Sequence, residues 1–278
     1  MRAQNLTIAV PDKGCDKNCP YCVSKMTGAI SANETLLLRN LPKVKSIARA
    51  AQVTSVLLTG KGEPTLNLPW TERLIEEFAE WPVELQTNGL RLAADMKNHN
   101  GAIIDKLAIA GLNLLAFSLD QITQFDDMAP MFSALRKRGI LVRVTLNVTD
   151  LLPAELTFDE ALQRCKQSQA QQFSLRQITI PNHVNLSGDE ASAVATWIKA
   201  HGTPALYDKL VGQMKERSTH LLRELPYGAK VYDVDGVAVT YFDYCVQDNH
   251  GDDDVRSLIL QEDGHLYTSW NSLASALF

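Results

Sequence analysis

Six short apolar segments alternate with longer helical patterns through the first two thirds of the chain, and this alternation restricts the possible folds more than any other feature. The segments are residues 6–10, 53–59, 83–87, 113–119, 140–148 and 173–180. Their mostly unbroken apolar character is typical of strands covered on both faces. Strands that alternate with helices in this way form parallel sheets. The sequence therefore predicts an α/β fold built from six β-α units.

The pattern changes beyond about residue 186. Two helices are predicted there, over residues 187–201 and 204–225, followed by two β-hairpins whose turns contain Asp235-Gly236 and Asp263-Gly264. Asp-Gly between alternating segments is a strong hairpin signal. Because no flexible linker precedes these elements, we expect residues 1–185 to form one domain and residues 186–278 an α+β extension that caps it.

Three of the five cysteines, Cys15, Cys19 and Cys22, lie within eight residues directly after the first predicted strand. That loop falls at the carboxyl end of the sheet, where α/β barrels carry their chemistry. An odd, clustered set of cysteines does not fit a disulfide framework. Soft thiolates restrict the ligand to zinc, copper(I) or an iron–sulfur cluster. A closed zinc site needs a fourth ligand, from Cys165 or Cys245 far along the chain, whereas a cluster held by three cysteines keeps one iron open.

The C-x3-C-x2-C spacing, with Tyr21 just before the last cysteine, resembles the radical S-adenosylmethionine (radical SAM) superfamily over roughly residues 5–185. The resemblance implies a partial (β/α)6 TIM-like barrel, a 4Fe-4S cluster on the three cysteines, and SAM bound to the fourth iron. It also implies an external one-electron donor of the flavodoxin or ferredoxin type. Reductive cleavage of SAM then gives a 5′-deoxyadenosyl radical that abstracts a hydrogen atom from the substrate. Tyr21 is expected near the adenine of SAM, although packing beside a metal loop is an alternative.

The ends of the second and third predicted strands also resemble the superfamily. Gly60, Gly62 and Glu63 are similar to its Gly-Gly-Glu-Pro segment, in which glycines allow close approach to a ligand and the carboxylate accepts a hydrogen bond from the SAM ammonium. Thr87 and Asn88 are similar to its Thr-Asn-Gly segment, which meets SAM. The alternatives are an ordinary β-α turn with a capping glutamate and a turn favoured by Asn-Gly.

Polar residues on the next three strands complete the predicted SAM site. Ser118 and Asp120 resemble the Ser-x-Asp strand ending of many members, with a helix N-cap as the alternative for both. Arg143 and Asn147 point the same way along the fifth strand. The resemblance implies that a basic or amide residue here reaches SAM, and Asn147, nearer the carboxyl end, is the stronger candidate. Arg176 lies inside the sixth strand and needs an anionic partner, either the SAM carboxylate, an acidic substrate or an internal carboxylate.

Residues 256–270 resemble the terminal hairpin of radical SAM enzymes with auxiliary clusters, such as molybdopterin-precursor cyclases and enzymes with a SPASM extension. Cys245 is the single cysteine in the extension, and one thiol cannot hold a second cluster of this kind. We therefore expect one cluster. Cys245 is a candidate catalytic thiol, with a small buried apolar residue as the alternative.

Charge and hydropathy restrict the partners. The net charge of −5 disfavours nucleic acid as the main partner. The sequence has no apolar run of about 18 residues and no secretory pattern, so we expect a cytoplasmic protein with no membrane segment. The predicted function is hydrogen abstraction from a small-molecule, nucleoside-like substrate. The alternatives are a peptide- or RNA-modifying radical SAM enzyme and, in another class, a zinc- or cluster-binding module without turnover.

Overall fold

The computed structural model describes residues 1–27, 30–182, 184, 186–225, 229–242 and 254–278. Within them, the strands are β1 (Ala3–Ala9), β2 (Ser55–Thr59), β3 (Val83–Thr87), β4 (Leu114–Leu119), β5 (Leu141–Val148), β6 (Gln172–Gln177), β7 (His220–Glu224), β8 (Lys230–Val234), β9 (Val237–Phe242), β10 (Val255–Leu260) and β11 (Leu266–Tyr267). The helices are α1 (Glu34–Ala50), α2 (Leu68–Glu77), α3 (Leu90–His99), α4 (Ala102–Ala110), α5 (Gln124–Lys137), α6 (Phe158–Gln167), α7 (Asp189–His201) and α8 (Pro204–Arg217).

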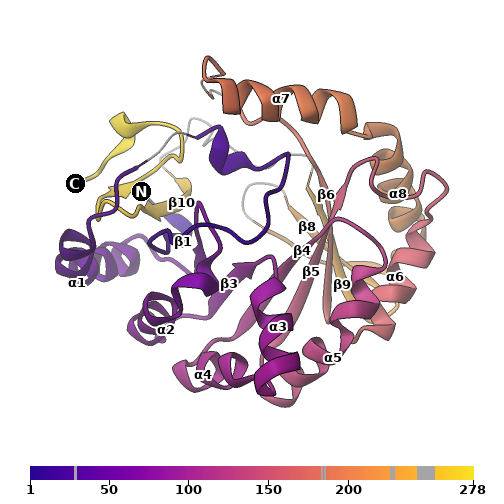
Figure 1. Cartoon of the computed structure of the whole chain (residues 1–278), viewed down its shortest axis with the longest axis horizontal. Coiled ribbons are helices and arrows are strands. Elements are labelled where there is room, and N and C mark those ends of the chain that lie inside the picture. The colour runs from indigo at the N-terminus through magenta and orange to yellow at the C-terminus, as the bar shows by residue number, and fades with distance from the viewer. Residues whose placement is uncertain (28–29, 183, 185, 226–228, 243–253) are drawn as a thin grey trace.

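The first six strands form the predicted parallel sheet. Each of β1 to β5 pairs in parallel with the next strand in the chain. Helices α1 to α6 lie around the outside of this curved sheet (Figure 1). The α/β fold and its partial barrel are therefore confirmed. Within the described residues, no helix has both the length and the apolar character needed to cross a bilayer.

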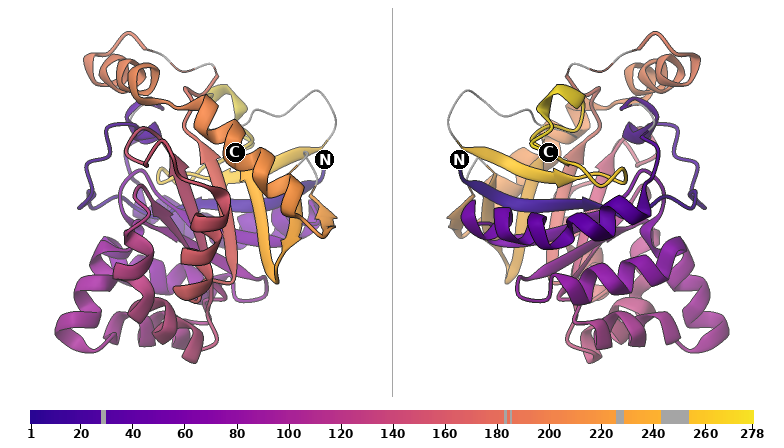
Figure 2. Two further views of the ribbon diagram at one scale, coloured as in Figure 1. Left: turned by 90° about the vertical axis from the view of Figure 1, so that its right-hand side faces the viewer. Right: turned by 90° about the vertical axis from the view of Figure 1, so that its left-hand side faces the viewer.

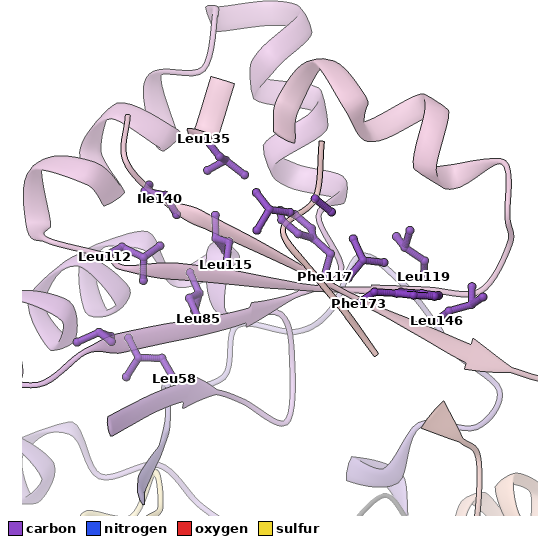
Figure 3. Close-up of a cluster of buried hydrophobic side chains, with 14 of the residues drawn as sticks. Leu58, Leu85, Leu112, Leu115, Phe117, Leu119, Leu135, Ile140, Leu146 and Phe173 are labelled. Carbon is purple, nitrogen blue, oxygen red and sulfur yellow. The ribbon is translucent and has the colours of Figure 1, made fainter. Parts of the chain in front are cut away.

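The apolar core lies between the sheet and its helices. Leu58, Leu85 and Leu115 are fully buried and stand in register on β2, β3 and β4. Together with Phe117 and Phe173 they form the layer under the helices (Figure 3). The opposite face of the strands is more polar than predicted, because β3 alternates buried Val, Leu and Thr with half-buried Glu and Gln. That inner face lines a cavity instead of a second core.

The C-terminal strands extend the sheet at both of its edges. The strand order is β11-β10-β1-β2-β3-β4-β5-β6-β9-β8-β7. β9 pairs in parallel with β6, and β10 pairs in parallel with β1, so the yellow β10 runs beside the indigo β1 in Figure 2. These strands therefore close the cavity from the side. The division at residue 186 stays a prediction, since strands from both sides of it share one sheet.

The predicted helix over residues 204–225 was wrong in its last part. Helix α8 ends at Arg217, and Ser218 turns into extended backbone with φ −63° and ψ 133°. Strand β7 follows and pairs antiparallel with β8. The predicted hairpin at Asp235-Gly236 is confirmed, with positive φ at both residues. Its first strand, β8, is the strand with which β7 pairs. Pairing with a neighbouring strand outweighs the local propensity of residues 220–224.

Candidate functional site

The loop that follows β1, residues 11–22, carries the three clustered thiols, and we call it the cysteine loop. Two hydrogen bonds hold its first part: the backbone N of Glu63 donates to the carbonyl of Gly14 (2.9 Å), and the backbone N of Asp12 donates to Glu262 Oε2 (2.9 Å). A Cβ at Gly62 would lie 2.0 Å from Asp12 Oδ1 and 2.2 Å from the Gly14 carbonyl. Glycine at 62 therefore lets the loop after β2 touch the cysteine loop.

The three thiols are free. Cys15 is exposed, while Cys19 and Cys22 are half-buried. Burial raises the pKa of the Cys15 and Cys19 thiols, and the nearby Lys17 ammonium opposes this at Cys19. Among the described residues, no three His, Cys, Asp or Glu side chains already stand together as a metal site. The loop thus supplies three soft donors of the kind that iron–sulfur clusters and zinc prefer, without a preformed cage.

Glu63 joins the loops after β2 and β3 to the cysteine loop. Its Oε1 accepts hydrogen bonds from Thr65 N (3.0 Å), Thr65 Oγ1 (2.7 Å) and Thr87 Oγ1 (2.7 Å), and its Oε2 accepts one from Asn88 N (2.9 Å). Asn88 Nδ2 in turn donates to Asp16 Oδ1 (2.7 Å). Glu63 is buried and caps the short 3-10 helix η2 (Pro64–Asn67). The structure brings the predicted Glu63, Thr87 and Asn88 together, and their contact with SAM stays a prediction.

A second polar cluster joins the cysteine loop to the ends of β4 and β5. The Tyr21 hydroxyl donates to Asp120 Oδ1, and Asn147 Nδ2 donates to Tyr21 Oη (3.1 Å) and Asp120 Oδ1 (2.9 Å). Lys17 Nζ forms an ion pair with Asp120 Oδ2 at 2.6 Å. Burial, together with the Asp120 charge, raises the pKa of the Tyr21 hydroxyl, so this group stays a proton donor. Asn147 Oδ1 is buried with no hydrogen-bond partner in the described residues and remains an open acceptor.

A cavity of about 730 Å³ lies on the inner face of the sheet. The predicted residues Gly60 and Ser118 line it, and the Ser118 carbonyl also accepts a hydrogen bond from Lys17 Nζ (3.5 Å). Trp270, after β11, lines the same cavity. Cys245 lies outside the described residues. The cavity therefore opens beside the cysteine loop and is bounded by strands from both parts of the chain.

Two predicted arginines line this cavity in different surroundings. Arg143 makes a two-pronged ion pair with Glu84, with nitrogen to oxygen distances of 2.8 Å, and donates from Nε to Gln172 Oε1 (2.9 Å). This pairing accounts for the Arg143 charge without SAM. Arg176 is half-buried at the carboxyl end of β6, and no hydrogen bond or ion pair engages it within the described residues. The carboxylate partner expected for an internal ion pair is therefore not found there.

Comparison with known proteins settles the family. Residues 10–166, more than half of the chain, match the Radical SAM superfamily. The chain belongs to this superfamily. Radical SAM proteins use a 4Fe-4S cluster and SAM, and the chain is an enzyme of this class. Its cysteine loop lies within the matched residues.

Two curated relatives share part of this radical SAM sequence. The GTP 3′,8-cyclase of Clostridium acetobutylicum is 28% identical over 134 residues, 47% of this chain and 41% of that protein. The GTP 3′,8-cyclase of Syntrophomonas wolfei is 30% identical over 147 residues, 50% of this chain and 39% of that protein. The matched segments thus span about two fifths of these relatives. Among solved structures, Streptococcus suis SuiB bound to precursor peptide SuiA is similar in fold, with a TM-score of 0.57 and 13% identity over 95% of this chain and 59% of that one.

Sequence reasoning missed two residues that hold this candidate site together. Lys17 lies between the first two cysteines, and only the three-dimensional structure places its ammonium on Asp120. Glu262 comes from the turn between β10 and β11, is 2% exposed, and accepts the hydrogen bond from Asp12 N. Burial raises the pKa of Glu262. The sequence around Glu262 predicts only the turn of a hairpin, and no local pattern indicates that its carboxylate contacts the cysteine loop.

Tyr21→Phe is expected to lower the free energy of unfolding by about 1–3 kcal/mol, because Asp120 and Asn147 lose a buried hydrogen-bond partner. The phenyl ring keeps its contact with Trp197, whose ring centroid is 5.5 Å from that of Tyr21. Urea unfolding of the cluster-loaded protein under anaerobic conditions measures the change. The matched control is Tyr232→Phe on β8, whose half-buried ring packs on Tyr241. Equal loss in both variants would contradict the assigned role of the Tyr21 hydroxyl.

Proposed function

We propose that this radical SAM enzyme holds a single 4Fe-4S cluster on Cys15, Cys19 and Cys22 and uses SAM to abstract a hydrogen atom from a small molecule. The observation that carries the proposal is the attachment of the cysteine loop to the ends of four further strands, β2, β3, β4 and β5, beside a cavity of about 730 Å³. Three thiolates leave one iron of a cluster open for an external ligand. When bound, the cluster supplies the electron for reductive cleavage of SAM.

The residues around the cysteine loop divide between holding the loop and binding SAM. Glu63 and Asp120 already accept hydrogen bonds from protein groups, so their main effect is to position the loop. Asn147 keeps one buried acceptor open, and this supports a direct hydrogen bond from SAM. Ser118 lines the cavity and is the proposed contact on β4.

A small substrate fits the cavity. Pockets for small molecules enclose roughly 300–1,000 Å³, and the cavity here falls in that range. The two curated relatives are named for GTP, a nucleotide, and this supports the nucleoside-like substrate indicated by the sequence. The proposal also includes a flavodoxin- or ferredoxin-type electron donor, which can approach the exposed side of the loop at Cys15, and a cytoplasmic location.

An anaerobic turnover experiment tests this function. The protein is reconstituted with iron and sulfide, then incubated with dithionite and SAM. We expect about four iron atoms per chain and formation of 5′-deoxyadenosine. Tightly bound zinc, no iron uptake and no 5′-deoxyadenosine would instead identify a zinc module and contradict the proposal.

A further inference from the structure

The cavity on the inner face of the sheet is lined by more cationic than anionic side chains. Its described lining contains five cationic side chains, Lys61, Arg143, Arg176, Arg223 and Arg256, and one anionic side chain, Glu84. The Arg143 ion pair neutralises Glu84. The chain as a whole carries a net charge of −5. Positive charge is therefore concentrated in the cavity against the overall balance of the molecule, as in clefts that attract anionic ligands.

Arg176 has the surroundings of an anion-binding group. It stands in register with Asn147 on β5 and with Phe242 on β9, at the carboxyl end of the sheet. A half-buried guanidinium without a counter-charge is unfavourable, because it has lost water and gained no partner. Within the described residues no carboxylate compensates it. A ligand carboxylate or phosphate in the cavity would do so through paired hydrogen bonds.

Arg223 brings a second cation to the cavity from the C-terminal strands. It lies on β7, at one end of the strand order, while Arg256 lies on β10 near the other end. Both residues line the same cavity, so the two ends of the sheet face each other across it. In the described part of the chain, neither Arg176 nor Arg223 is bonded to the cysteine loop. Both arginines line the cavity and are therefore available to a ligand bound there.

We propose that the substrate of this enzyme is a small molecule with a phosphate or carboxylate group, and that Arg176 and Arg223 bind this anionic group. The inference rests on the proposed function, because it names the substrate class of the same cavity. In this proposal Arg176 binds the substrate, and the amino and carboxylate groups of SAM would bind the open iron of the cluster. The C-terminal extension then has a direct part in substrate binding, since β7 supplies Arg223.

Isothermal titration calorimetry on the reconstituted, SAM-bound protein tests the proposal with two probes, inorganic pyrophosphate and succinate. We expect one of them to bind with one site per chain, and the probe that binds identifies phosphate or carboxylate as the preferred group. Arg176→Gln and Arg223→Gln should each raise the Kd of the bound probe by at least about tenfold, since each substitution removes charged hydrogen bonds. The matched control Arg136→Gln removes an exposed cation outside the cavity and should leave Kd unchanged.

Three results would overturn the proposal. The first is that neither probe binds, and the second is that both cavity variants bind as tightly as the parent protein. The third is one-for-one displacement of the probe by SAM in the cluster-loaded protein, which would place Arg176 in the SAM site. Far-UV circular dichroism shows whether each variant folds. If Arg176→Gln misfolds, the Kd of Arg223→Gln decides the test, because Arg223 is exposed and its replacement should not disturb folding. Because calorimetry needs no turnover, a failure to form 5′-deoxyadenosine is recorded separately.

Discussion

Replacing Cys19 with alanine is expected to abolish cluster binding and 5′-deoxyadenosine formation together. The cysteine loop supplies three thiols, and a cluster with one iron open to SAM needs all of them as ligands. Mutation of a residue that hydrogen-bonds to a metal ligand reduces metal affinity or activity roughly 10–100-fold, so removal of the ligand itself should reduce them further. Iron and sulfide content, visible absorbance and 5′-deoxyadenosine are measured on the anaerobically reconstituted variant.

The matched control is Cys165→Ala. Cys165 is fully buried on α6, and burial raises its pKa to about 12, so it stays a neutral thiol away from the cysteine loop. Removal of this sulfur should cost on the order of 1–2 kcal/mol of stability and leave the iron content unchanged. If Cys19→Ala retained a full cluster, or if both variants lost it, the assignment of the three ligands would be wrong.

Gly62→Ala is expected to displace the cysteine loop and sharply reduce SAM cleavage. The new methyl group would lie 2.0 Å from Asp12 Oδ1 and 2.2 Å from the Gly14 carbonyl, and the second of these is backbone. Overpacking of this kind costs about 1–3 kcal/mol or more. Moving Gly14 also breaks its hydrogen bond with Glu63 N, one of the bonds that hold the loop. The rate of 5′-deoxyadenosine formation and the urea midpoint are compared with those of the parent protein.

Gly60→Ala in the same loop is the control for this substitution. A Cβ at position 60 would lie 3.4 Å from the Val10 carbonyl, which is ordinary van der Waals contact. We therefore expect nearly unchanged stability and iron content. A similar loss of urea stability in the two alanine variants would show that close contact at Gly62 is not the reason for glycine there.

The sequence predicted the parallel sheet and the cysteine loop because both depend on local patterns. Apolar strand segments alternate with helices, and the carboxyl ends of parallel strands meet at one edge of the sheet. For this reason Glu63 and Asn88, 25 residues apart, were expected at one site, and the structure places them in contact. The same reasoning located Asp120 and Asn147, which hydrogen-bond to each other.

Other features depend on long-range contacts that no local pattern reports. Glu262 bonds to Asp12 across 250 residues of chain. Strand β7 forms because it pairs with β8, so the helix predicted for residues 220–224 from their local sequence was wrong. The polar inner face could have been recognised in part, because Glu84 and Gln86 alternate with apolar residues on β3. Without the curvature of the sheet, that alternation does not distinguish a cavity from a solvent-exposed surface.

The pairing of β1 with β10 has a consequence for how the chain reaches its native state. Ala3 pairs with Val255, so the outer partner of β1 is synthesised about 250 residues after β1 itself. Contacts between such distant residues slow folding, because loop-closure entropy is lost before they form. Until then both edge strands of the six-stranded sheet, β1 and β6, present unpaired backbone groups that favour aggregation. Folding during synthesis is thus expected to depend on chaperones, because the strands that complete the sheet and enclose the cavity are the last to be made.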